Sequence, residues 1–200
     1  MIRAACIRAT KLVTLLSACI ATSSVAQRLP ARSNLWIDAG VGYGRLRVQC
    51  LSCSSPTSVG GTAVTVSIGG TPSRYVLLGV EGQVWTGSDA GIHEQVRSIN
   101  LVVHWYPWGL HNGLFLRGGT GLVDGIVAPN DTTRARASVK GQGLGISISA
   151  GCDLPLGRHF ALTLQAGDQI AALGDLLVLG SKADDTIAYV SRFSVAFTLR

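Results

Sequence analysis

The sequence predicts an all-β protein, an eight-stranded antiparallel up-and-down transmembrane β-barrel. Three observations predict it: a secretory leader, about eight segments in which apolar residues alternate with small or polar ones, and no apolar run long enough for a membrane-spanning helix after the leader. Successive side chains of a strand point to opposite faces, so each segment has one apolar and one polar face. One such strand would also suit a soluble sandwich, but eight in an exported chain indicate lipid outside and a polar interior.

The leader comes first. The opening residues carry three positive charges and no negative ones, residues 12–21 are apolar, and residues 24–26 read Ser-Val-Ala. This pattern predicts cleavage before Gln27, which gives a signal peptide of residues 1–26 and a barrel domain of residues 27–200.

An alternative reading of the leader is open. The tetrad that ends at Cys19 reads Leu-Ser-Ala-Cys and looks like a lipobox, which would make Cys19 a lipidated N-terminus. The apolar run itself is shorter than the ~20 residues that a spanning helix needs.

Composition agrees with a barrel and limits the function classes. Charged residues make up 14 % of the chain, against about 25 % in an ordinary soluble domain. Removal of the leader lowers the net charge from +6 to +3. This mild excess gives no argument for a nucleic-acid partner.

The first four predicted strands each carry a row of alternate apolar residues. In the first, the apolar parity changes after Gly44 to Leu46 and Val48, which indicates either a bulge or the exit of the strand from the bilayer. The predicted ranges are 35–48, 62–69, 74–86 and 94–106, with outward rows that include Val41, Val64, Val80 and Leu101.

The last four predicted strands follow the same rule. The clearest is 143–153, where Leu144, Ile146 and Ile148 alternate with glycine and serine. The others are 114–123, a strand that starts at Phe160, and 186–199.

The connections alternate in length. Short turns are predicted at residues 70–73, 107–113 and 155–158, and longer distal loops at 49–61, 88–92, 126–138 and 168–185. Aromatic residues flank the short turns, as in the interfacial girdles of outer-membrane barrels, which puts these turns on the periplasmic side.

The chain resembles the small bacterial outer-membrane β-barrel families, the OmpA/OmpX/OmpW-like group. The residues that carry the resemblance are 75–85 (YVLLGVEGQVW), 114–122 (LFLRGGTGL), 143–158, which ends in GCDLPLGR, and the alternating last strand. Such barrels usually end in an aromatic residue that the assembly machinery recognises. This chain ends Phe197-Thr198-Leu199-Arg200, so either assembly is less efficient or Phe197 serves as the signal.

Charged residues of inward parity form the main candidate site. We expect Asp38, Glu81, Arg117 and Arg192 to form one interior charge cluster, because an unpaired buried ion is expensive. The functional alternative is a proton or solute path. The structural alternative, an ion-pair network that fills a narrow barrel, is favoured because eight strands enclose little more than their own side chains.

Two further sets of residues could carry chemistry. His104 with Ser98 or Ser147 and a carboxylate could imitate a hydrolase triad, but no nucleophile-elbow motif is present. Cys50 and Cys53 lie in a predicted surface loop of an exported chain, where a small disulfide is a better interpretation than a redox site. No catalytic residue, cofactor or metal site is predicted.

The predicted function is therefore a structural or surface-interaction role in the outer membrane, carried by the distal loops. The first alternative is a small-solute channel of the OmpW kind, since inward glycines could leave a lumen; the second is a lipid-modifying enzyme, which we consider less well supported. The resemblance implies as partners outer-membrane lipid and lipopolysaccharide, and periplasmic chaperones and the barrel-assembly machinery during biogenesis. A monomer is expected.

Overall fold

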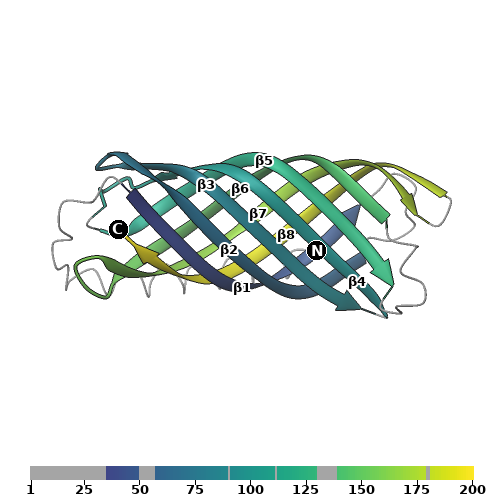
Figure 1. The fold of residues 1–200 in the computed structure, drawn as a ribbon, viewed down its shortest axis with the longest axis horizontal. Helices are drawn as coiled ribbons and strands as arrows, with labels where there is room; N and C mark the ends of the chain where they lie inside the picture. Colours follow the sequence, from purple (N-terminus) through teal and green to yellow (C-terminus); the bar gives the residue numbers. More distant parts are fainter. Residues whose placement is uncertain (1–34, 50–56, 90, 111, 130–138, 179–180) are drawn as a thin grey trace, which may run out of the picture.

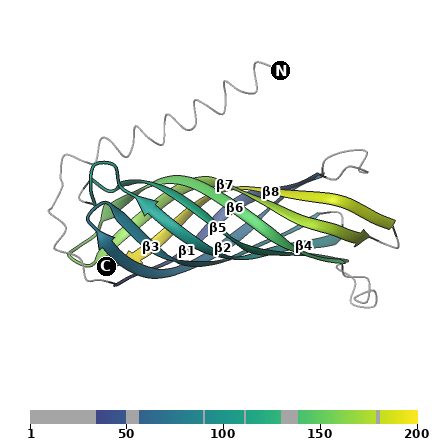
Figure 2. The same ribbon diagram turned by 90° about the horizontal axis from the view of Figure 1, so that it is seen from above.

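Eight strands close into a single antiparallel barrel (Figures 1 and 2), in which each strand pairs with its neighbours in sequence and β1 also pairs with β8. The strands are β1 (Leu35–Gln49), β2 (Thr57–Ser73), β3 (Val76–Asp89), β4 (Ile92–Trp105), β5 (Leu114–Pro129), β6 (Val139–Pro155), β7 (Phe160–Val178) and β8 (Ser181–Leu199). This computed structural model describes residues 35–200 apart from 50–56, 90, 111, 130–138 and 179–180. Within those ranges, no helix is long and apolar enough to cross a membrane.

The stagger of the strands sets the width of the barrel. A path that starts at Trp36 and follows paired residues once around the sheet returns to β1 at Leu46, ten residues further along. Such a stagger tilts the strands strongly against the barrel axis, as Figure 1 shows. Eight strands with this geometry leave an interior just wide enough for side chains to fill.

The two ends of the barrel differ. We call the end at which β1 begins and β8 ends the proximal end, and the opposite end distal. The proximal connections are the predicted short ones, although the β2–β3 turn is centred on Arg74 and Tyr75 rather than on residues 70–73. Backbone bonds tie these turns together, since Tyr106 and Leu110 donate to the carbonyls of Tyr75 and Arg74 over 2.8 and 3.2 Å.

The prediction of four longer distal loops is wrong for two of them, and the other two are shorter than predicted, since residues 57–61 lie in β2 and residues 126–129 in β5. Residues 168–178 and 181–185 lie in the paired ends of β7 and β8, and Asp89 pairs with Ile92 in a β3–β4 hairpin. Gly91 of that hairpin has a φ of 80°, a conformation that glycine adopts without strain. The strands therefore extend further at the distal end than their lipid-facing rows indicate.

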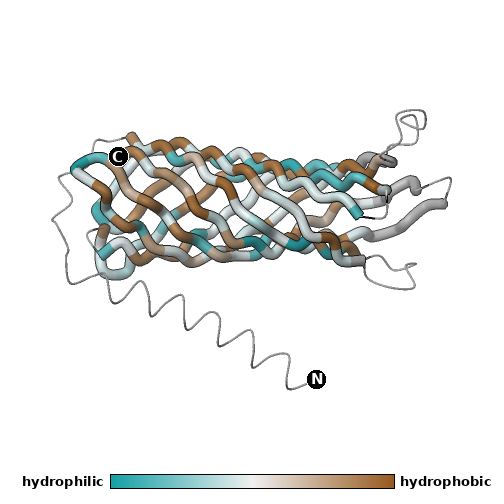
Figure 3. The backbone as a smooth tube through the Cα atoms, turned by 90° about the horizontal axis from the view of Figure 1, so that it is seen from below, coloured by the Kyte–Doolittle hydropathy of each residue, from teal (hydrophilic) through white to brown (hydrophobic). Residues whose placement is uncertain are grey.

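An apolar belt surrounds the proximal and middle parts of the barrel. Along β6 it includes Leu144, Ile146 and Ile148, which are 67–68 % exposed. Cys152 lies in the same row but is 3 % exposed and disulfide-bonded. A tilted strand of about ten residues rises roughly 20–25 Å, close to the apolar band of outer-membrane barrels. Figure 3 shows the alternation of brown and paler residues along the strands.

The polarity of the two faces inverts towards the distal end. Along β4 the outward row passes from Leu101 and Ile99 to Arg97, while the inward row passes from Ser98 to Val96. In β1 the same change at Leu46 occurs without a bulge, because the pairing of β1 with β2 is continuous there. The parity change in the sequence therefore marks the exit of β1 from the apolar belt.

The interior consists of three layers along the axis. The proximal cluster is apolar and contains Trp36, Leu77, Val102, Tyr106, Leu110 and Phe115. The distal cluster is also apolar and contains Leu46, Val59, Ala63, Trp85, Val96, Val123, Ala171, Leu173, Ala188 and Val190. Between them lies a polar layer of buried side chains: Asp38, Thr65, Ser67, Glu81, Gln83, Ser98, Asn100, Arg117, Ser147, Ser149, Gln165, Gln169, Arg192 and Ser194.

Candidate functional site

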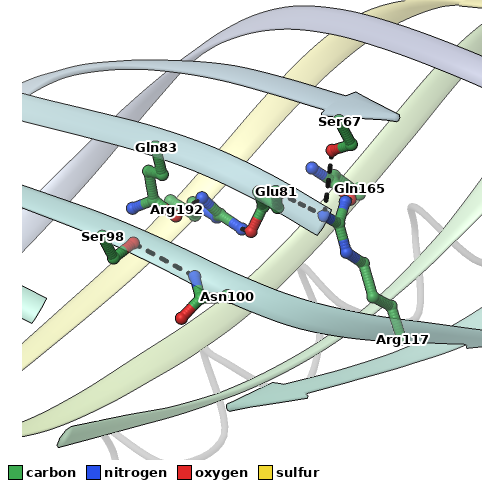
Figure 4. A network of polar contacts seen from close by, with 8 residues as sticks. All are labelled: Ser67, Glu81, Gln83, Ser98, Asn100, Arg117, Gln165 and Arg192. Atoms are coloured by element: carbon green, nitrogen blue, oxygen red, sulfur yellow. Dashed lines mark hydrogen bonds and ion pairs between the residues drawn. The ribbon is translucent and has the colours of Figure 1, made fainter. Parts of the chain in front are cut away.

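Glu81 is the centre of the polar layer. It lies on β3, its side chain is fully buried, and its Oε2 accepts a hydrogen bond from Nη2 of Arg117 on β5. Its Oε1 lies 3.4 Å from Nη2 of Arg192 on β8. One carboxylate thus binds two guanidinium groups from strands that are far apart in sequence, as Figure 4 shows.

Neutral side chains complete the binding of the two arginines. Arg117 donates to Ser67 Oγ over 3.2 Å and to the amide oxygen of Gln165 over 3.4 Å. Arg192 donates to the amide oxygen of Gln83. Because these partners lie on β2, β3 and β7, the network connects opposite walls of the barrel.

The structure brings three of the four predicted cluster residues into contact. Asp38 is buried at the same level, and Ser67 lies between Asp38 and Glu81 in the strand register. Asp38 forms no ion pair with any arginine in the described part of the chain. Its nearest connection to the network is therefore Ser67, to which Arg117 donates.

A second buried cluster lies at the proximal end and was not predicted. Asp153 forms an ion pair with Arg200, and it accepts hydrogen bonds from Tyr106 over 2.7 Å and from Thr163 over 2.6 Å. Arg200 Nη2 also lies 3.3 Å from Tyr106 Oη. The sequence carries a signal for it, because Arg200, directly after the end of β8, continues the inward parity of Arg192.

The triad suggested by His104 is not assembled. His104 packs between the rings of Trp36 and Phe115, whose centroids lie 5.0 and 5.3 Å from its own. Ser98 is six residues further along β4, roughly 20 Å away in an extended strand, and Ser147 lies in the polar layer. His104 therefore belongs to the aromatic packing of the proximal cluster.

Another histidine contacts hydroxyl groups at the distal β3–β4 hairpin. Nδ1 of His93 lies 3.1 Å from Ser88 Oγ, and its Nε2 lies 3.3 Å from Thr86 Oγ1. Both ring nitrogens therefore face hydroxyls, and no carboxylate in the described ranges is hydrogen-bonded to the ring as in a hydrolase triad.

The described residues assemble no metal centre, and they include one of the five cysteines. Within them, no group of three or more His, Cys, Asp or Glu side chains is placed to hold a metal ion. The predicted Cys50–Cys53 disulfide, the signal peptide and Cys19 lie outside the described residues, so these remain predictions.

Comparison with known proteins identifies the fold. Neisserial surface protein A superposes with a TM-score of 0.56 at 12 % identity, over 84 % of this chain and 97 % of that one. Ail, the attachment invasion locus protein of Yersinia pestis, gives 0.49 at 12 % identity, over 84 % and 100 % of the two chains. The outer-membrane protease OmpT of Escherichia coli gives 0.40 at 8 % identity, over 86 % and 99 %.

These similarities establish the architecture alone. Identity is too low to transfer an activity, and the two TM-scores below 0.5 carry no argument. No family model and no curated protein matches the sequence. The closed eight-stranded barrel with its apolar belt is the architecture of a protein that spans the bacterial outer membrane, and the chain is localised there.

Proposed function

We propose that this chain is a closed outer-membrane barrel with a structural or surface-interaction role, rather than a solute channel. One observation carries the proposal: side chains fill the interior in three successive layers, two apolar clusters with a charged layer between them. A conducting barrel needs a continuous polar path, and the distal apolar cluster, which draws side chains from seven of the eight strands, interrupts it. At the proximal end the aromatic cluster and the ion pair of Asp153 with Arg200 fill the interior together.

The inward glycines support a closed interior, although they kept the channel alternative open in the sequence. A Cβ built on Gly79 would lie 2.7 Å from the ring of Trp36, and one on Gly151 would lie 2.6 Å from the ring of Phe115. Gly61 and Gly87 stand in the same relation to Trp85, at 2.6 Å each. These glycines accommodate large aromatic side chains, so they do not widen a lumen.

The distal parts of the strands add to the proposed interaction surface of the distal loops. Outside the apolar belt, the outward rows of β1 and β4 carry Arg45, Arg47, Arg97 and Gln95, all on regular paired strands. An enzymatic role has no assembled catalytic group to support it among the described residues, and its absence remains a prediction.

Release of solutes from liposomes tests the closed barrel. Vesicles that contain the refolded protein should retain small sugars and amino acids as well as empty vesicles do, while vesicles with a general porin should release them. Folding is checked by the heat-dependent gel mobility of β-barrels. Release that falls with solute size and exceeds that of empty vesicles would support the channel and refute the closed barrel.

A further inference from the structure

A cleft on the outer wall, separate from the buried network, has the features of a ligand site. It has a volume of about 550 Å³ and is formed by β1, β7 and β8. Arg45 and Arg47 line it from β1, Tyr189 and Ser191 from β8, and Asp168 from β7. All five side chains have the outward parity of their strands.

The cleft begins where the apolar belt ends. On β1, Arg45 is the next outward residue after Tyr43, which is 63 % exposed. On β8, the exposed Phe193 belongs to the belt, and Ser191 is the neighbouring outward residue on its distal side. This is the level at which lipid head groups of the distal leaflet meet the barrel wall.

The two arginines differ from other arginines of the molecule. Arg97, which lies at a similar level on β4, donates to the side-chain oxygen of Gln95 over 2.9 Å, and Arg117 and Arg192 are bound inside the barrel. Arg45 and Arg47, by contrast, have no hydrogen-bond or ion-pair partner in the described part of the chain. Two residues apart on one face, their Cα atoms lie ~7 Å apart, so both guanidinium groups reach the same space.

Neighbouring strands leave these guanidinium groups accessible and add hydroxyl donors. Across β8, Arg45 pairs with Ser191 and Arg47 pairs with Tyr189. Across β2, Arg45 pairs with Gly60, where the hydroxyl of Tyr43 occupies the space that a Cβ would take. The guanidinium fork matches the geometry of phosphate oxygens and binds them in a bidentate manner.

We propose that this cleft binds the phosphate of a lipid in the outer leaflet. The phosphate is bound by Arg45 and Arg47, and the acyl chains lie on the apolar belt over Tyr43 and Phe193. Asp168 lines the same cleft from β7, on the other side of β8. Its carboxylate would repel a bare phosphate, so it favours a phosphate with a bound cation such as Mg²⁺. The proposal rests on the membrane-spanning arrangement and not on the closed lumen, so the liposome result does not affect it.

Native mass spectrometry of the refolded protein in detergent tests the site. The probes are lipid A, dephosphorylated lipid A and phosphatidylglycerol, each titrated with and without Mg²⁺. The variant R45Q/R47Q should bind phosphorylated lipid at least tenfold more weakly than the unmodified protein. The matched control R97Q removes one positive charge at a similar level outside the cleft and should bind normally.

The probes also separate the sources of the phosphate. Tighter binding of lipid A than of phosphatidylglycerol would assign the site to a phosphomonoester, and equal binding would assign it to lipid phosphate in general. Both results support the proposal provided that dephosphorylated lipid A binds weakly. In D168N, the dependence of binding on Mg²⁺ should decrease. Unchanged affinity in R45Q/R47Q, or an equal loss in R97Q, would overturn the proposal; heat-dependent gel mobility confirms that each variant is folded.

Discussion

The middle and the distal parts of this barrel are built from the same eight strands but with opposite polarity. In the middle, Glu81 and Arg117 face inward and Leu101 faces lipid. At the distal end, Trp85 faces inward and Arg97 faces outward. The middle is therefore organised as a membrane protein, with buried charges and an apolar exterior, and the distal end as a soluble barrel with an apolar core.

This difference shows that alternation defines a strand but not the solvent on each of its faces. The period of two is the same in both regions, and only its phase changes. The phase changes where the strands leave the apolar belt, so polarity within one strand locates the membrane boundary. Substitutions on the two sides of this boundary should therefore have opposite consequences.

The largest effect is expected at Glu81, in the charged interior. Glu81→Gln leaves Arg117 and Arg192 buried without their shared carboxylate and should cost about 3–5 kcal/mol of unfolding free energy. Arg117→Gln should cost less, because Arg192 still contacts Glu81. Urea unfolding in detergent micelles measures both.

A double-mutant cycle sharpens this prediction. The variant that combines Glu81→Gln with Arg117→Gln should be more stable than Glu81→Gln alone, because it removes a stranded charge. Strictly additive losses would mean that the two side chains act independently.

In the apolar interior of the distal end, Trp85→Ala should cost about 3–5 kcal/mol through the cavity that it leaves. Trp85→Phe, which keeps most of the ring volume, is the conservative control and should lose much less. If both variants unfold at the urea concentration of the unmodified protein, the distal cluster makes no contribution to stability.

On the exterior, the comparison can be made within one strand. Leu101→Arg places a charge in the apolar belt and should cost ~2–4 kcal/mol in a lipid bilayer, whereas Gln95→Arg, of the same parity on β4 but outside the belt, should cost ~0–1 kcal/mol. Equilibrium unfolding from lipid vesicles measures the difference. Equal losses of stability in the two variants would show that the boundary of the apolar belt on β4 is not where we assign it.

A smaller effect than at Glu81, Trp85 or Leu101 is expected at the proximal end. Tyr106→Phe removes the hydrogen bond to Asp153, and hydrogen bonds to charged groups contribute about 1.5–3 kcal/mol. The retained ion pair with Arg200 should keep the loss at the lower end of that range. Urea unfolding of Tyr106→Phe, compared with Asp153→Asn, checks this; a loss in Tyr106→Phe as large as in Asp153→Asn would contradict it.

Much of the fold could be predicted from the sequence because lipid imposes a strict rule. Outward residues such as Ile148 must be apolar, so the number of strands, their order and their inward faces can be predicted from the two-residue period of apolar side chains. The sequence predicts a loop at the distal ends of β7 and β8 because apolar residues there, such as Ala171 and Leu173, face inward and so add nothing to a lipid-facing row. A pattern of lipid-facing residues gives no information about the parts of a strand that extend beyond the membrane.

The candidate site was harder to predict because parity gives a direction and not a partner. Parity predicts that Glu81 and Arg117 face inward, but whether they meet depends on the stagger of the strands. That stagger, ten residues for one circuit of the sheet, cannot be deduced from the sequence of any single strand. Asp153 has the inward parity of β6, yet its partner Arg200 lies just beyond the end of β8. The cleft at Arg45 combines three strands, so only the closed barrel reveals it.

The positions of the tryptophans make the molecule its own optical probe. Trp36 and Trp85 lie inside the proximal and distal clusters at 1 % and 0 % exposure, while Trp105 and Trp108 are 50 % and 60 % exposed on the proximal rim. Brominated acyl chains quench indole fluorescence on contact, and only the rim pair is within their reach. The emission that survives such quenching comes from the two clusters, so it reports the packing of the interior while the protein remains in its membrane.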